Sequence, residues 1–240
     1  MTLDELVTQL KAAHGDALLG VVVYGSTAAD AANPPAKRGH NVLVVVRTLD
    51  VTAMHAGGAI GRSWHEAGNA VPLTLTDAEW RSSVDVFAIE HADIAERNLV
   101  LFAAGGFALV ERAVIRDADI RDQLEYESLA LVLAVRAGIA AVGRDAKEQR
   151  ALLASQASRA LALFRAGVRL SGAVPVADAE ALCAQAGQMA GFDPQPFVSP
   201  LRQKRGTAEV PKGELDTVLG GFHTGLMHFV ALIDGKSVGK

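Results

Sequence analysis

The sequence predicts an α+β protein in which a small domain with a mixed β-sheet precedes an all-helical bundle. Apolar runs rich in β-branched residues alternate with helical segments up to about residue 115. After that point, apolar residues recur every three or four positions with no strand-like run between them. The chain has 240 residues, enough for two small cores, so we expect an α/β domain over residues 1–115 and a helical domain over residues 116–240.

Strands and helices alternate in the first half. The run Leu18–Tyr24 is apolar and ends at Gly25, which predicts a buried strand, and Ser26 is expected to cap a short helix ending near Ala32. Thr76 followed by Glu79 has the spacing of a capping box. The other expected elements are helices over residues 3–13, 50–67 and 77–83, strands over 41–46 and 71–75, and one or two strands between 86 and 102.

The second half shows only the helical period. Four apolar stripes predict helices over residues 120–142, 153–168, 176–190 and 215–233, which suit a bundle. The last stripe suits a bundle core, and a homodimer or partner interface is the alternative. The proline-flanked stretch 197–211, with Arg202, Lys204 and Arg205, predicts a linker loop.

Composition excludes several classes of protein. A formal net charge of -4 and an aromatic content of 5% argue against a nucleic-acid-binding surface. Cys183 is the only cysteine, so no disulfide within the chain can form. The most apolar stretch, residues 129–142, is too short to cross a membrane, and the first ten residues lack the apolar core of a signal peptide. These observations predict a cytoplasmic protein.

The strand that ends at Tyr24-Gly25-Ser26 is the first segment that could carry chemistry. A glycine lets a phosphate approach the backbone, and a helix N-terminus with a serine supplies N–H and O–H donors. Gly25 and Ser26 are therefore candidates for holding a nucleotide or another phosphorylated small molecule. A tight turn with a capping serine explains the same residues without a ligand.

Three further segments make the pattern more specific. Tyr24-Gly25-Ser26-Thr27-Ala28-Ala29, followed by the strand 41–46, resembles the "YGSAA … SDINLLVV" version of the nucleotidyltransferase (DNA polymerase β-like) superfamily found in a group of bacterial proteins with a C-terminal helical domain. Residues 83–94 resemble that group's "DxFPIExxDI" segment, and residues 120–125 with Arg136 resemble its "LRxQxE … LR" helix. The resemblance implies a nucleotidyltransferase-like fold over roughly residues 18–170.

The carboxylates that this resemblance implies are largely missing. The superfamily's second strand opens with two acids two residues apart, which share one face and hold Mg²⁺. Here the matching residues are Gly39, which offers no ligand, and Asn41, which offers a neutral oxygen. His40 between them is expected to point to the opposite face and to be a poor magnesium ligand.

A third superfamily carboxylate lies in a later strand between two apolar residues. Asp93, between Ala92 and Ile94, fits that pattern as a catalytic and metal-binding residue, and Glu90 is the next candidate. Asp93 could equally be an ordinary solvent-facing strand acid. His91 and Asp93 lie two apart on the same expected strand, and His223 and His228 lie five apart on a helix, which is a poor spacing for metal ligands.

Three hypotheses follow. The chain is a degenerate nucleotidyltransferase that binds a nucleotide, a phosphorylated ligand or a protein partner without efficient turnover. Alternatively, it is an active Mg-dependent nucleotidyltransferase acting on a small molecule or protein through Asp93, Glu90 and Asn41. Third, it is a non-catalytic interaction module whose helical half drives dimerisation.

Overall fold

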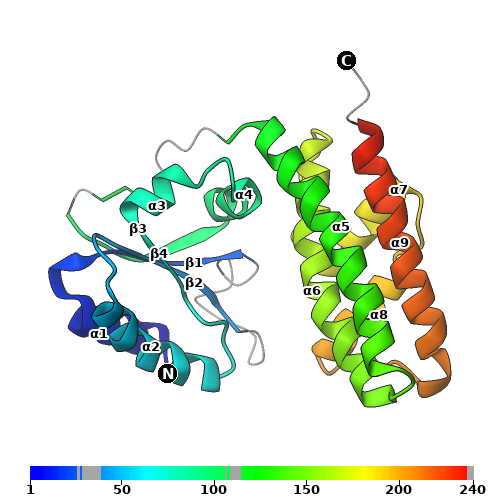
Figure 1. Ribbon diagram of the computed structural model, residues 1–240, viewed down its shortest axis with the longest axis horizontal. Helices are drawn as coiled ribbons and strands as arrows, with labels where there is room; N and C mark the ends of the chain where they lie inside the picture. The colour runs from blue at the N-terminus through cyan, green and yellow to red at the C-terminus, as the bar shows by residue number, and fades with distance from the viewer. Residues whose placement is uncertain (26–27, 29–38, 106, 109–114, 237–240) are drawn as a thin grey trace. The chain divides into compact units, whose positions relative to one another are not determined.

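The computed structural model describes residues 1–25, 28, 39–105, 107–108 and 115–236. The chain divides into two compact units, Met1–Arg116 and Asp117–Lys240, which are described separately below (Figure 1). Ser26 and most of the short helix expected after it lie outside the described residues.

The first unit is built around a four-stranded sheet. Its strand order is β3-β2-β1-β4, with β1 antiparallel to both β2 and β4 and with β2 parallel to β3. The predicted mixed sheet is therefore confirmed. The elements in chain order are α1 (Leu3–His14), η1 (Gly15–Ala17), β1 (Leu18–Tyr24), β2 (Asn41–Val46), α2 (Val51–Glu66), β3 (Leu73–Thr76), α3 (Asp77–Ser82), α4 (Ala88–Glu96) and β4 (Asn98–Ala103).

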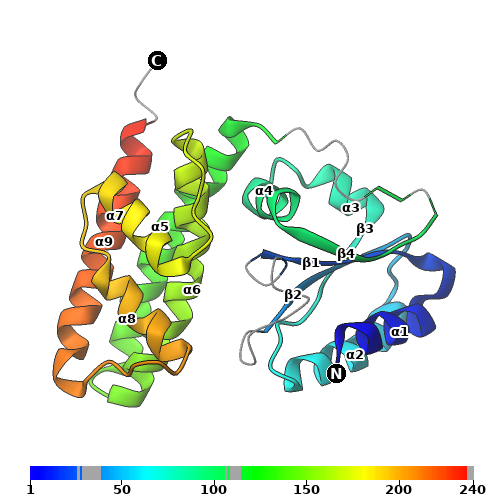
Figure 2. The ribbon, with the colours of Figure 1, turned by 180° about the vertical axis from the view of Figure 1, so that it is seen from behind.

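Helices cover both faces of this sheet (Figures 1 and 2). Because strand side chains alternate between faces, Val21 and Val23 pack with α1 and α2, whereas Val22 packs with Trp80 of α3 and Ile94 of α4. Two separate apolar layers result, one on each face. This is why β1 up to Val23 and β2 from Val42 have runs of consecutive apolar residues and not only alternate ones.

The segment between Val86 and Phe102 contains one strand, β4, which is one of the two predicted alternatives. The residues around Asp93, which were expected to lie in a strand, form helix α4 instead. The sequence from Val86 to Ile94 fits either period. Tertiary packing decides, because the helical form buries Ala88, His91 and Ala92 together. Strand β3 also begins at Leu73 and not at residue 71.

In the second unit all regular elements over residues 117–236 are helices. Five phenylalanine rings from α6, α8, α9 and the α7–α8 connection meet at centroid distances of 4.4–5.4 Å. These rings are Phe164, Phe192, Phe197, Phe222 and Phe229. The helices are α5 (Asp117–Val142), α6 (Ala146–Leu170), α7 (Ala179–Ala190), α8 (Gln195–Lys204), the 3₁₀ turn η3 (Lys212–Glu214) and α9 (Leu215–Lys236).

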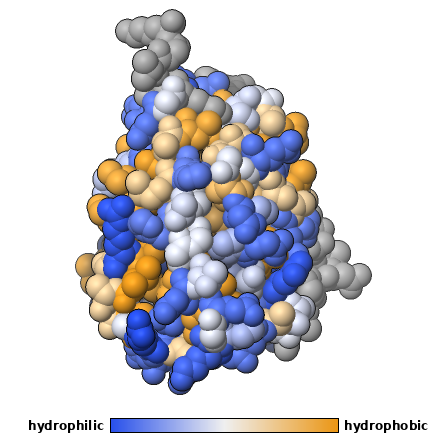
Figure 3. Space-filling view, turned by 90° about the vertical axis from the view of Figure 1, so that its right-hand side faces the viewer, coloured by the Kyte–Doolittle hydropathy of each residue, from blue (hydrophilic) through white to orange (hydrophobic). Residues whose placement is uncertain are grey.

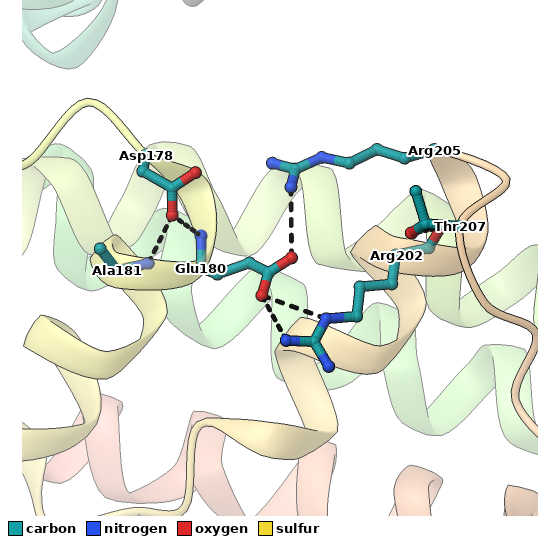
Figure 4. A network of polar contacts seen from close by, with 6 residues as sticks. All are labelled: Asp178, Glu180, Ala181, Arg202, Arg205 and Thr207. Atoms are coloured by element: carbon teal, nitrogen blue, oxygen red, sulfur yellow. Dashed lines mark hydrogen bonds and ion pairs between the residues drawn. The ribbon is translucent and has the colours of Figure 1, made fainter.

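Helix α8 corrects the predicted linker over residues 197–211. Pro196 lies in the first turn, where the backbone N–H has no helical partner to lose, and Pro200 is tolerated inside the helix. Burial of Phe197 and Leu201 in the bundle stabilises the helix despite these prolines. Figure 4 shows that Arg202 and Arg205 are held by Glu180 of α7, with N–O distances of 2.6 and 3.3 Å.

The apolar stripe of α9 is used inside the chain. Leu219, Phe222, Leu226 and Phe229 are buried in the helical unit itself. On the face drawn in Figure 3, hydrophobic residues are interspersed with hydrophilic ones.

Within residues 1–25, 28, 39–105, 107–108 and 115–236, no helix combines the length and the apolar character needed to span a membrane.

Candidate functional site

Most of the candidate residues lie at the end of the sheet where β1 finishes and β2 and β4 begin, which we call the Tyr24 edge. Tyr24, the last residue of β1, pairs with Asn41 at the start of β2 on one side and with Asn98 at the start of β4 on the other. Strand parity places Asn41 on the face covered by α3 and α4, because Leu43 and Val45 of the same strand pack there. The predicted candidate Asn41 therefore lies at the end of β1, beside Gly25.

Glu90 and Asp93 lie on helix α4 and not on a strand. In a strand, residues three apart point to opposite faces, but in a helix they share one face. Burial, together with the negative charges of Glu90 and Asp93, raises the pKa of Tyr24 above its usual value. Both predicted acids thus raise the pKa of Tyr24, the residue that ends β1. They share one face because they lie on a helix, whereas on a strand they would point to opposite faces.

Gly25 has a structural requirement of its own. Its φ is +80°, a conformation that side-chain-bearing residues rarely adopt. Its backbone N–H donates to the carbonyl of Arg97 at 3.0 Å, and the side-chain nitrogen of Asn41 lies 3.4 Å from where a Cβ would be. The Gly25 amide is thus already engaged, so a phosphate at this edge needs other donors.

The position of the first missing carboxylate is sterically closed. A Cβ at Gly39 would collide with the carbonyl oxygen of Gly68 and would lie 3.0 Å from the Cα of Asn69. Asn69 also accepts a hydrogen bond from the His40 backbone N–H at 2.9 Å and donates one to the carbonyl of Trp64 at 3.2 Å. The connection after α2 therefore occupies the space that an aspartate at position 39 requires.

The histidines near these residues are packing residues. His40 is buried against Trp64, on the face opposite Asn41, as strand parity predicts. His91 is stacked on Trp80 with ring centroids 3.8 Å apart, and Ser83 Oγ lies 3.3 Å from its Nε2. Burial lowers the pKa of His91 to about 4. His91 and Asp93 do not share a strand face, because both lie on α4.

The histidines of the helical unit are likewise engaged with neighbours. His223 Nε2 accepts from Arg136 Nε at 3.0 Å, and His228 Nδ1 lies 2.9 Å from the carbonyl of Gly191. Among the side chains that the structure describes, no three His, Cys, Asp or Glu residues could together hold a metal ion. The described donors at the sheet edge are two carboxylates on α4 and the neutral Asn41 amide, a set that does not fit a full Mg²⁺ site.

Sequence reasoning missed two residues at this edge. Tyr24 lies between Asn41 and Asn98 in the sheet, and the charges of Glu90 and Asp93 raise its pKa. Asn98 donates to the carbonyls of Ile94 and Ala95 at 2.9 and 3.4 Å and so fixes the end of α4 beside β4. Tyr24 precedes Gly25 directly, so the strand-end pattern contained that signal, whereas nothing local marked Asn98.

Comparison with known proteins identifies the fold. The spectinomycin adenyltransferase AAD(9) from Enterococcus faecialis, solved with ATP and spectinomycin, aligns with a TM-score of 0.60 and 10% sequence identity. The alignment covers 94% of this chain and 98% of that one. No family model matches the sequence. No curated protein matches it either.

The likeness extends over both units. The alignment with the adenyltransferase thus includes both the sheet domain and the helical domain of this chain. At 10% identity the likeness shows the fold alone. This chain has the architecture of a nucleotidyltransferase-like α/β domain followed by a helical domain.

Proposed function

We propose that this protein binds a nucleotide or a similar phosphorylated ligand at the Tyr24 edge of the sheet and transfers nucleotidyl groups inefficiently or not at all. The observation that carries the proposal is the pair Gly39 and Asn41. Asn41 has a neutral side chain, and any side chain at position 39 would collide with the Gly68 carbonyl. Without carboxylates there, the charge that develops during nucleotidyl transfer lacks its usual metal counter-ions.

The two acids on α4 give this proposal a specific electrostatic consequence. Glu90 and Asp93 are half-buried and share one helix face near Tyr24. A phosphorylated ligand that binds without metal is repelled by both carboxylates. A ligand that binds through Mg²⁺ needs them instead. Whether the two carboxylates weaken or strengthen ligand affinity therefore distinguishes the two modes of binding.

The alternative is an active Mg-dependent nucleotidyltransferase that modifies a small molecule or protein. What favours it is that Glu90 and Asp93 both lie close enough to Tyr24 to raise its pKa. A carboxylate in such a place could accept a proton from an acceptor hydroxyl. The similar adenyltransferase was solved with ATP and a small molecule, spectinomycin, so a small-molecule acceptor belongs to this alternative.

The first experiment is calorimetric titration of the full chain with ATP, GTP, CTP and UTP, each with and without Mg²⁺. We expect heat of binding for at least one nucleotide without metal. Heat that appears only with Mg²⁺ would instead favour the active enzyme. If no nucleotide gives heat, the interaction module remains, for which the exposed side chains Tyr126, Leu129 and Leu133 on α5 offer a surface.

Charge-neutralising variants make the test sharper. For metal-free binding we expect Glu90→Gln and Asp93→Asn each to strengthen nucleotide affinity about two- to fivefold, since a repulsion is removed. For metal-dependent binding the same variants would weaken affinity at least tenfold. Asp85→Asn is the matched control, because Asp85 is exposed and lies in the turn before α4.

A further inference from the structure

A cavity of about 500 Å³ lies in the first unit, away from the Tyr24 edge. Its walls come from α1, from α2 and Leu49 before it, and from the segment that leads into and includes β3. Helices α1 and α2 lie side by side on one face of the sheet in both ribbon views (Figures 1 and 2). The volume lies within the range of small-molecule sites.

Glycines in α2 create this space. Gly57, Gly58 and Gly61 all line the cavity, although glycine in a helix interior costs about 1 kcal/mol relative to alanine. A Cβ at Gly58 would meet no atom within 4 Å, and one at Gly61 would make ordinary contacts with Val71 and Pro72. The cavity is therefore open where a longer side chain would fill it without distorting the backbone.

The charge of the walls selects the ligand. His14, Arg62 and His65 line the cavity, and none of its described lining residues is acidic. Arg62 is the charged side chain among them, because burial lowers the pKa of His14 and so favours the neutral form of its ring. The remaining walls are mainly apolar, with Leu10, Met54 and Val71 among them.

We propose that this cavity binds a small organic monoanion, a free carboxylate with an apolar body of roughly eight to fifteen non-hydrogen atoms. The apolar body would lie along the glycine side of α2, and the carboxylate would face Arg62, because Nδ1 of His65 already lies 2.9 Å from the carbonyl of Asn69. This site is independent of the proposed nucleotide site, because it lies on the sheet face covered by α1 and α2, whereas Glu90 and Asp93 lie on α4 on the other face.

The test uses the full chain with ¹³C-methyl-labelled methionine, because Met54 lines the cavity. The probes are octanoate, its neutral analogue octanamide and its cationic analogue octylammonium. We expect octanoate to shift the Met54 methyl resonance saturably, with a Kd on the order of 0.1–1 mM for a ligand of this size. Octanamide should bind about tenfold more weakly, and octylammonium should not bind. No Met54 shift with about 10 mM octanoate, ten times the upper end of that range, or equal shifts with octylammonium, would overturn the proposal.

Two variants locate the binding. Gly58→Leu fills the cavity and should abolish the octanoate shift, whereas Ala59→Leu, exposed on the same helix and outside the cavity, should retain it. Arg62→Gln should weaken octanoate about five- to tenfold and leave octanamide unchanged, since the lost contribution is a charge-assisted contact. Octanoate binding that survives both Gly58→Leu and Arg62→Gln would show that the ligand lies elsewhere.

Discussion

In the α/β unit both tryptophans are stacked against buried histidines, whereas in the helical unit phenylalanines are packed against glycines. Trp64 lies against His40 and Trp80 against His91. A Cβ at Gly167 would lie 2.7 Å from the ring of Phe229, and one at Gly225 would lie 2.6 Å from that of Phe197. The first core contains groups that mild acid can charge, and the second contains close contacts that one added methyl group can disrupt.

The two kinds of core should therefore fail under different conditions. Both tryptophans of the chain lie in the first unit, so tryptophan fluorescence reports on that unit alone. Far-UV circular dichroism reports on the helices of both units. Following unfolding with both probes is needed because a two-unit chain need not unfold in one step.

The largest expected effect is the acid sensitivity of the α/β unit through His91. Burial lowers the pKa of His91 from 6.5 to about 4 in the folded protein. Between these pH values His91 is therefore protonated in the unfolded chain but stays neutral in the folded one. Its contribution to stability is complete above pH 6.5 and falls by up to about 3 kcal/mol as the pH drops to 4. Urea unfolding followed by tryptophan fluorescence at several pH values measures this loss.

His91→Phe is the variant that tests the cause. A phenyl ring can still stack on Trp80 but cannot be protonated, so the fall in stability between pH 6.5 and 4 should become smaller. His40, whose pKa burial also lowers, would account for a remaining slope. If the variant kept the wild-type pH dependence in full, His91 would not be the group responsible.

The next effect is steric and lies in the helical unit. Gly225→Ala places a methyl group 2.6 and 2.9 Å from the Phe197 ring, and we expect a loss of about 2 kcal/mol in the free energy of unfolding. Gly220→Ala on the same helix meets nothing within 4 Å and should stabilise the protein by up to about 1 kcal/mol. Urea unfolding followed by circular dichroism gives both values. Equal effects of the two variants would contradict the close contact.

Gly39→Ala asks whether the α/β unit contains a steric constraint of its own. The added methyl group would meet the Gly68 carbonyl, and we expect a loss of about 1–2 kcal/mol by tryptophan-monitored unfolding. Gly58→Ala, with open space around it, is the control and should be neutral or stabilising. Wild-type stability of Gly39→Ala would mean that the 68–69 connection yields easily, and that a carboxylate at position 39 could then be restored.

The smallest effect concerns the charged contacts between α7 and α8. Hydrogen bonding to Arg202, followed by the charges of Arg202 and Arg205, lowers the pKa of Glu180 below 4.5. Its stabilising contribution is present above pH 4.5 and is lost as the pH falls through the lowered pKa. Because the pair with Arg202 is largely exposed, we expect Glu180→Gln to lower the melting temperature at pH 7 by only about 1–2 °C. An equal decrease at pH 3 would contradict the ionic origin.

Local patterns were sufficient where one signal dominated. Strands β1 and β2 have the bounds that their β-branched runs predicted, and α3 begins with the capping box of Thr76 and Glu79. Helices α4 and α8 were missed because their local signals are ambiguous or adverse. One fits both the strand and the helix period, and the other contains Pro200. In both cases burial of apolar residues outweighs local preference.

The candidate site divides in the same way. The residues Gly25, Asn41, Glu90 and Asp93 could be singled out from the sequence, as could the missing carboxylates at positions 39 and 41. Whether these residues meet could not be predicted, because β1, β2 and α4 come together only through the sheet order and the packing of α4 on it. The blocking of position 39 by residues 68 and 69 is also a contact between segments distant in the chain.

The sequence by itself therefore determined the α+β class, the helical second half and the presence of glycine and asparagine at positions 39 and 41, because these depend on composition, on period and on the identity of single residues. The tertiary structure decided that Glu90 and Asp93 share a face beside Tyr24, that Gly39 has no room for a side chain, and that three glycines of α2 open a cavity. Each of these depends on which segments pack together, and that is set by burial summed over the whole unit and not by any local run of residues.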